Sequence, residues 1–214
     1  INTENKTRQK KMSNGKLALE KNVNAVNIAI YASGGGTNAK KIIEYFKTSL
    51  NTKISLIVCN KPTAGVLQIA RLLAIPILLI EKESFLNGNG YLPTLQQHKI
   101  DFIILAGFLW KIPLVVIKAY PKKIINIHPA LLPKYGGKGM YGQNVHEAVI
   151  AAKETQSGIT IHFVDEVYDD GEIIFQATCP VTLTDTAQTL ATKIQLLEHI
   201  HYAPTIASVL PKQR

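Results

Sequence analysis

From residue 26 onward, short apolar runs alternate with amphipathic stretches. The runs are almost continuously apolar, which is typical of strands that are buried on both faces of a sheet. In one of the stretches between them, Ala39, Ile42, Ile43 and Phe46 recur with the period of a helix. The pattern predicts strands at 26–32, 54–59, 76–80, 102–105 and 124–127, and helices around 39–46, at 66–73 and ending over 92–99.

Strands that alternate with helices predict an α/β fold with a mostly parallel, doubly wound sheet. The run 102–105 is the most apolar, and we expect it at the centre of the sheet. The last third of the chain differs. It predicts a helix at 145–153, strands at 158–164 and 173–181 joined by an acidic turn, and a helix from 186 to about 202. We therefore expect an antiparallel element near the C-terminus.

The chain has 214 residues, of which 46% are hydrophobic and 18% are charged, and this predicts one domain with a sizeable core. We expect residues 1–22 to form a polar, poorly ordered N-terminal extension, and residues 23–214 to form the domain. No uncharged apolar run is longer than 102–110, which at nine residues is far shorter than the ~20 residues that span a bilayer. The first residues also lack the apolar stretch of a secretory signal. These features predict a cytoplasmic protein.

Cysteines and charge narrow the possible ligands. Cys59 and Cys179 do not belong to a C-x-x-C pair or to a set with zinc spacing, so we expect reduced thiols and no metal. The formal net charge is +9, with +4 in residues 1–22. That balance suits an anionic small ligand and does not require nucleic acid.

Ser33-Gly-Gly-Gly-Thr-Asn38 follows the first strand and leads into the first helix. Glycines let the backbone approach an anion, and the N–H groups of a helix N-terminus stabilise phosphate. The spacing of Gly34, Gly36 and Ala39 also matches the dinucleotide fingerprint, but the second strand ends in Cys59-Asn60-Lys61 without the acid that would hold a ribose. A tight turn without a ligand stays an alternative.

Asn126 and His128 end the fifth predicted strand, and alternation places both on the same side of it. An amide donor beside an imidazole suits acyl chemistry, because one can stabilise a developing oxyanion while the other handles a proton. A structural histidine is the competing interpretation. We interpret His98, His146, His199 and His201 as surface or helix-face residues.

The stretch 165–172 holds five acidic residues in a basic protein. It lacks the alternating pattern of a calcium loop, and most of its carboxylates fit a solvated turn. One carboxylate turned inward could orient His128.

Together these elements resemble the glycinamide ribonucleotide transformylase family, folate-dependent enzymes of purine synthesis. The resemblance covers about 27–210 and lies in the runs 32–38, 105–109, 126–135 and 157–164 and in Asp169-Asp-Gly171. It implies transfer of a formyl group from the co-substrate 10-formyltetrahydrofolate to the amine of glycinamide ribonucleotide, without a metal. It also implies a Rossmann-like fold, no nucleic-acid or membrane partner, and a monomer or homodimer.

The resemblance assigns residues to three roles. The catalytic group matches Asn126, His128 and Asp169. The substrate-binding group matches Gly36, Thr37, Asn38, Ala39 and Glu198. The folate-binding group matches Leu109, Trp110, Lys111, Ile112 and Asp165.

This chain departs from the family at the folate wall. Leu109-Trp110-Lys111 stands where Met-Arg is usual, and a second arginine expected near 85–91 is absent. We expect Trp110 and Lys111 to lie at the cleft edge and to replace part of what the arginines do. We expect the Asp169 carboxylate within direct or one-water reach of His128, with its far side hydrogen-bonded by the backbone of its own turn.

Other functions remain alternatives. The core residues also fit a formyltransferase for a sugar nucleotide, or a nucleotide-binding module without catalysis. Methionyl-tRNA formyltransferase would need a further RNA-binding domain after Arg214. Formyltetrahydrofolate hydrolase would need a regulatory domain larger than the 22 N-terminal residues.

Overall fold

The computed structural model describes residues 25–211, so the predicted N-terminal extension lies outside the described residues. The elements are, in order, β1 (Val26–Ala32), α2 (Thr37–Phe46), β2 (Thr52–Cys59), α3 (Gly65–Leu72), β3 (Ile77–Leu79), α4 (Lys82–Leu86), α5 (Leu92–Gln97), β4 (Phe102–Leu105), α6 (Leu114–Ala119), β5 (Ile124–His128), α7 (Gln143–Ala151), β6 (Gln156–Phe163), β7 (Ile173–Pro180) and α8 (Ala187–Val209).

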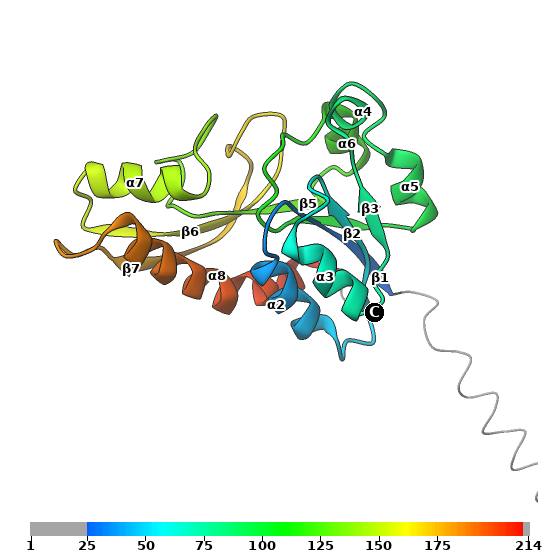
Figure 1. Cartoon of the computed structure of the whole chain (residues 1–214), viewed down its shortest axis with the longest axis horizontal. Helices are drawn as coiled ribbons and strands as arrows, with labels where there is room; N and C mark the ends of the chain where they lie inside the picture. The colour runs from blue at the N-terminus through cyan, green and yellow to red at the C-terminus, as the bar shows by residue number, and fades with distance from the viewer. Residues whose placement is uncertain (1–24, 212–214) are drawn as a thin grey trace, which may run out of the picture.

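Within the described part of the chain, the strands form one seven-stranded sheet in the order β3-β2-β1-β4-β5-β6-β7 (Figure 1). The first five strands are parallel, whereas β6 pairs antiparallel with β5 and β7 antiparallel with β6. The predicted fold class is confirmed, and so is the central position of β4.

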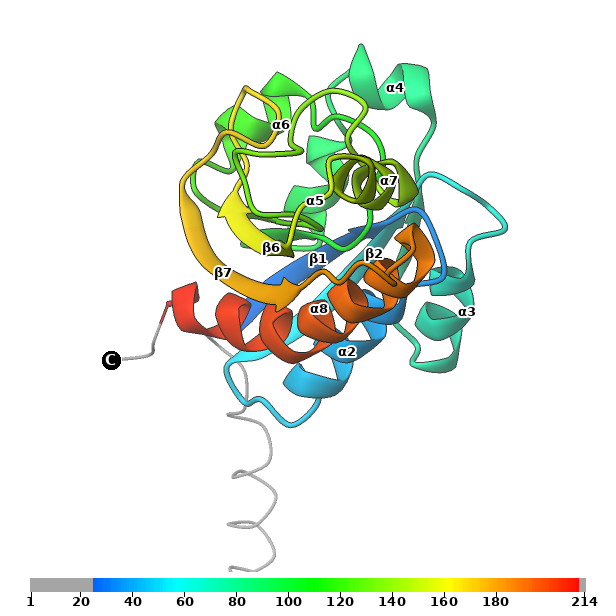
Figure 2. The same cartoon turned by 90° about the vertical axis from the view of Figure 1, so that its left-hand side faces the viewer.

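Two hydrophobic cores cover the two faces of this sheet. In β1, Ile28 and Ile30 face the core under α2, α3 and α8, while Ala29 and Tyr31 face the core under α4, α5 and α6. Figure 2 shows α2 and α8 below the strands and α4 and α6 above them. Because β1 is buried on both faces from Ile28 to Ala32, this part of its sequence is a continuous apolar run.

Two short helices were not predicted, and α8 is longer than predicted. The helices α4 and α6 have five and six residues, too few to display a helical repeat in the sequence. The last helix begins at a capping box between Thr186 and Thr189 and continues past Pro204 to Val209. Buried Tyr202 and Ile206 pack on either side of the proline, so tertiary contacts hold the helix together there.

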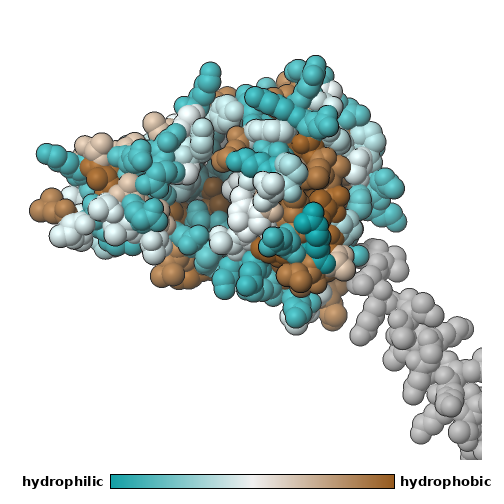
Figure 3. All heavy atoms as spheres, viewed as in Figure 1, coloured by the Kyte–Doolittle hydropathy of each residue, from teal (hydrophilic) through white to brown (hydrophobic). Residues whose placement is uncertain are grey.

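Some apolar side chains reach the surface. Leu72 at the end of α3 is 85% exposed, and Figure 3 shows apolar side chains around this helix amid a largely polar face. None of the helices between residues 25 and 211 combines the length and the apolar composition needed to cross a bilayer.

The order of the strands creates a crevice at one end of the sheet. The chain leaves β1 toward β2 on one side and returns to β4 on the other side of β1. In open α/β sheets, ligands bind at such a switch point, beyond the carboxyl ends of the strands. The loops after β1, β4 and β5 therefore meet at one place.

Thr160 fastens the loop that follows β5. Its side chain is fully buried and its Oγ1 donates to the carbonyl of Ala130 at 2.7 Å. The same oxygen accepts from the N–H of Leu132 at 3.0 Å and from Nε2 of Gln176 at 2.9 Å. One hydroxyl thus satisfies buried groups of the loop and ties the loop to the sheet.

We expect Thr160→Val to lower the free energy of unfolding by about 1–3 kcal/mol, because it leaves the buried N–H of Leu132 without an acceptor at nearly constant shape. Chemical denaturation followed by circular dichroism measures this. The control is Thr178→Val, which makes the same change at an exposed position of β7. Equal effects of the two variants would contradict the role given to the Thr160 hydroxyl.

Candidate active site

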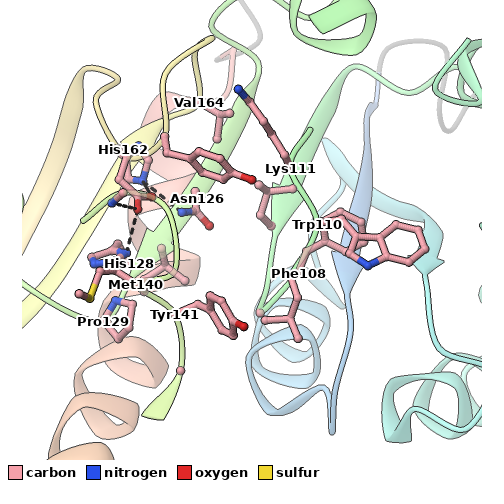
Figure 4. Close-up of a pocket in the computed structure, with 18 of the residues that line it drawn as sticks. Phe108, Trp110, Lys111, Asn126, His128, Pro129, Met140, Tyr141, His162 and Val164 are labelled. Atoms are coloured by element: carbon pink, nitrogen blue, oxygen red, sulfur yellow. Dashed lines mark hydrogen bonds and ion pairs between the residues drawn. The ribbon is translucent and has the colours of Figure 1, made fainter. Parts of the chain in front are cut away.

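A cleft of about 710 Å³ opens at the carboxyl ends of the central strands. This volume is in the range of small-molecule sites, ~300–1,000 Å³. The lining comes from the segments 107–112, 126–129, 137–143 and 162–169 and from the N-terminal half of α8. In Figure 4, Asn126, His128 and His162 gather on one side, and Phe108 and Trp110 lie on the other.

His162 holds the Asn126 amide in a defined orientation. The two residues are directly opposite each other in the antiparallel β5–β6 pair. Nδ1 of His162 lies 2.9 Å from the carbonyl of Phe163, which can only accept, so Nδ1 carries the proton. Nε2 then accepts from Nδ2 of Asn126 at 3.1 Å. Because an amide nitrogen has two hydrogens, the second remains free to bond a ligand in the cleft.

The His128 ring is oriented in the same way from its other side. Its Nε2 lies 2.7 Å from the carbonyl of Tyr135, so this nitrogen is the donor. Its Nδ1 therefore faces Oδ2 of Asp169, 3.6 Å away. This confirms that the carboxylate lies within reach of the imidazole, at a separation that a small displacement or one water would bridge.

Asp169 also touches two other segments. Its Oδ1 lies 3.7 Å from Nε2 of His162, and its Oδ2 accepts from the N–H of Gly137 at 2.9 Å. The prediction that its own turn would bond it was therefore wrong. The turn's N–H at Val167 is already bonded to Oδ1 of Asp165. The partner of Asp169 comes instead from the glycine-rich loop after β5.

Burial sets the charge of the three histidines in the cleft. It lowers the pKa of His128, while the carboxylate of Asp169 and the carbonyl of Tyr135 partly oppose this. Burial also lowers the pKa of His162 and of His146. These rings are thus held neutral at pH 7, and Asp169 stands ready to stabilise His128 if the imidazole gains a proton.

Two of these residues were missed by sequence reasoning. His146, interpreted as a helix-face residue, is 6% exposed and lines the cleft from α7. Its Nδ1 has no hydrogen-bond partner among residues 25–211. His162 stood inside the recognised run 157–164 without a role, and the pairing of β5 with β6 would have placed it beside Asn126.

The loop after β1 forms the N-terminus of α2. Gly36 has a φ of +80°, and a Cβ there would lie 2.8 Å from that of Val66, so only glycine fits. The first turn of α2 has no side-chain cap and no acidic residue, which leaves its N–H groups suited to an anion. Ala39 is buried in the core, so only its backbone can serve the site.

Asn38 and Glu198 join α2 to α8 at the cleft. Nδ2 of Asn38 donates to Oε2 of Glu198 at 2.8 Å, and both residues line the cleft. Burial raises the pKa of Glu198, and the bond from Asn38 partly offsets the shift. The Thr37 hydroxyl accepts from Nε2 of Gln195 at 3.4 Å and does not line the cleft.

Buried Ser33 connects the two loops that frame the cleft. Its N–H donates to the carbonyl of Gly107 at 3.1 Å, and its Oγ accepts from the N–H of Leu109 at 3.0 Å. The loop after β4 is thereby fixed to the loop after β1, and neither is free to shift alone.

The predicted folate wall lies along the loop after β4. Leu109, Trp110, Lys111 and Ile112 all line the cleft, and Asp165 lines it from the acidic turn. The Trp110 ring packs at 6.1 Å from Phe85 and 6.2 Å from Phe108. Nζ of Lys111 lies 5.0 Å above the ring of Tyr168, so the loop and the acidic turn meet across the mouth. Residues 25–211 include no group of three or more His, Cys, Asp or Glu side chains that could hold a metal ion.

A family model described as formyl transferase matches residues 26–206. The phosphoribosylglycinamide formyltransferase of Bacillus subtilis is 36% identical over 187 residues, which cover 85% of this chain and 93% of that protein. A chloroplastic protein of the same name from Vigna unguiculata is 42% identical, and the match covers 85% of this chain and 60% of that protein. The chain thus spans less than two thirds of that plant relative, and the same holds for the one from Arabidopsis thaliana, at 64%.

Solved structures are similar over the same region. The crystal structure of phosphoribosylglycinamide formyltransferase from Bacillus halodurans has a TM-score of 0.79 at 35% identity, covering 87% of this chain and 96% of that one. The corresponding structure from Coxiella burnetii has a TM-score of 0.77 at 34% identity, covering 89% of this chain and 91% of that one.

The lowered pKa values of the cleft histidines predict that acid destabilises the fold. Above the unfolded pKa of about 6.5 these rings are neutral in the folded and the unfolded chain, so their contribution to the stability of the fold is fully present there. Below it the unfolded chain binds protons that the folded chain resists, and we expect the free energy of unfolding to fall by up to about 1.4 kcal/mol per pH unit for each ring. Denaturation between pH 7.5 and 5.5 measures the slope.

The raised pKa of Glu198 makes the free energy of unfolding rise as the pH falls, which opposes the effect of the histidines. The test therefore compares the pH slopes of proteins that all retain Glu198. We expect His146→Asn to make the pH dependence shallower. The control, His98→Asn, changes a histidine at the end of α5 that does not line the cleft. A slope that His146→Asn leaves unchanged would rule out burial of this ring as a source of the acid sensitivity.

Proposed function

The chain belongs to the formyl transferase family, and we propose that it transfers a formyl group from 10-formyltetrahydrofolate to the amine of glycinamide ribonucleotide. The observation that carries the proposal is the meeting of Asn126, His128 and Asp169 in one cleft whose other end is an uncapped helix N-terminus. Relatives named phosphoribosylglycinamide formyltransferase support the same activity.

In the proposed reaction the amine nitrogen attacks the formyl carbon and forms a C–N bond. The carbonyl oxygen becomes negative, and the donors that stabilise it are the free N–H of Asn126 and the His128 ring once it has gained a proton. The bond from the formyl carbon to N10 of the folate then breaks. Because the amine loses one proton and N10 gains one, the site has to move a proton between them, and Asp169 beside the imidazole is suited to that transfer.

The substrate phosphate would bind at the N-terminus of α2, where Gly36, Thr37, Asn38 and Ala39 supply backbone N–H groups. Glu198 lies beside Asn38 and would accept hydrogen bonds from the polar groups of the ribonucleotide. Binding both reactants in one cleft supplies proximity, which can lower a barrier by ~7–11 kcal/mol.

The folate would lie against Leu109, Trp110, Lys111 and Ile112, with Asp165 on the opposite wall. Trp110 belongs to an aromatic cluster with Phe85 and Phe108, which gives the wall a rigid apolar surface. In place of the expected arginines, Lys111 on this wall is a cation available to an acidic group of the folate; Lys138 also lines the cleft. A cytoplasmic location and a monomeric or homodimeric state remain predictions.

A steady-state assay with the purified chain tests the proposal. We expect formylated glycinamide ribonucleotide and tetrahydrofolate to form in equal amounts. Transfer to the amine of a sugar nucleotide, but not to glycinamide ribonucleotide, would favour the alternative substrate. Binding of either substrate without turnover would favour a non-catalytic module and contradict the proposal.

We expect Asp169→Asn to leave both KM values near normal and to lower kcat by ~100-fold or more, as loss of acid–base assistance does. The variant keeps the shape of the side chain and removes its charge. Asp170→Asn is the matched control, because Asp170 is exposed and does not line the cleft. If Asp170→Asn inactivates the enzyme and Asp169→Asn does not, the catalytic assignment is wrong.

A further inference from the structure

The carbonyl that bonds His128 belongs to a residue with an unusual backbone. Tyr135 has a φ of +57°, in the left-handed region that non-glycine residues adopt at a cost of about 1–2 kcal/mol. In this conformation its carbonyl lies 2.7 Å from Nε2 of His128. Gly136 and Gly137 follow in the chain, so a glycine position was available nearby, yet a tyrosine occupies this one.

The Tyr135 side chain is anchored outside the cleft. Its hydroxyl donates to Oε1 of Glu154 at 2.9 Å, just after the end of α7. The same oxygen accepts from Nζ of Lys134 at 2.9 Å. The Glu154 side chain is 26% exposed, whereas that of Lys134 is 69% exposed. We therefore expect the ion pair with Lys134 to contribute little to holding Glu154 in place. Neither Glu154 nor Lys134 lines the cleft.

We propose that Tyr135, held by Glu154, is a positioning residue that keeps His128 in the tautomer with its proton on Nε2. The unprotonated Nδ1 then faces Asp169, and the mobile proton of the reaction has to enter at Nδ1. The inference deepens the proposed function, on which its catalytic consequence rests. Gly137, two residues on, bonds Asp169, so one short segment orients both partners of the proton transfer.

The groups that face His128 come from three elements besides this loop. Asp169 lies in the acidic turn, His162 is on β6, and His146 is on α7. Asp169 attracts a proton to Nδ1, while the two histidines disfavour a charge on the ring. Without the Tyr135 carbonyl, a neutral ring would bond Asp169 better with its proton on Nδ1. The two tautomers therefore compete, and the carbonyl favours Nε2–H.

The first experiment reads the tautomer directly, without substrate. Nitrogen-15 NMR of the full chain with labelled histidine distinguishes protonated from unprotonated ring nitrogens, and His128→Asn assigns the signals. We expect His128 of the unmodified chain to be the Nε2–H tautomer at pH 7.5. In Tyr135→Phe, which keeps the ring and loses the bond to Glu154, we expect a second population with the proton on Nδ1.

Three further variants separate positioning from simple stability. Glu154→Ala should act like Tyr135→Phe. Glu154→Gln still offers an oxygen to the hydroxyl and should keep most of the Nε2–H tautomer of the unmodified chain. Lys134→Met removes the other bond to Glu154 and should leave the tautomer unchanged. In the transfer assay we expect Tyr135→Phe and Glu154→Ala to lower kcat by about 10-fold and to shift its pH profile, with smaller changes in KM.

The inference is overturned if Tyr135→Phe lowers the melting temperature but leaves both the His128 tautomer and the pH profile of kcat unchanged. An unmodified chain with its His128 proton on Nδ1 would overturn it as well. The NMR result does not depend on turnover. A confirmed tautomer without formyl transfer would therefore count against the proposed function alone.

Discussion

The carboxylate of Asp169 is the point at which the separate parts of the site meet. It accepts from the backbone of Gly137 and faces both His128 and His162. A carboxylate that is largely enclosed has to be satisfied by donors or by positive charge, because an unpaired charge in a low-dielectric site is costly. The N–H of Gly137 meets part of that requirement and ties the acidic turn to the glycine-rich loop, while the ring nitrogens on β5 and β6 that face the carboxylate carry no proton. Asp169 itself has a φ of +56°, so its backbone is held away from the common conformations to make these contacts.

The fold supports this arrangement through a few buried hydrogen bonds between chain segments. Ser33 joins the loops after β1 and β4, and Thr160 joins the loop after β5 to the sheet. The Tyr202 hydroxyl lies 2.8 Å from the carbonyl of Leu105, the last residue of β4, and 3.1 Å from that of Ile125 in β5. Tyr202 follows Glu198 by one turn of α8, so the same helix is fastened to the strands and carries the acid that bonds Asn38 of α2. Strands and helices thus carry Asn126, His128 and Glu198, whereas Asp169 and the segment 109–112 lie on loops.

Much of the fold could be predicted from the sequence, because each central strand is an almost continuous apolar run, and simple alternation places Asn126 and His128 on one side of β5. The role of His162 could not be, since it depends on which residue of β6 lies opposite Asn126. The partner of Asp169 was missed for a similar reason, because Gly137 is 32 positions away and lies in a loop without a periodic pattern. The helices α4 and α6 were too short to show a repeat. Local patterns thus predict elements, while contacts between loops depend on the assembled structure.

The central claim is that Asp169 and His128 act as one unit in moving the proton of the transfer reaction. A double-mutant cycle tests it most directly, with kcat measured at saturating substrates for Asp169→Asn, His128→Asn and the variant that carries both. Residues that act together are not additive, so the double variant should be about as slow as the slower single variant. If the two losses multiply, the residues act independently, and the account of the site is contradicted.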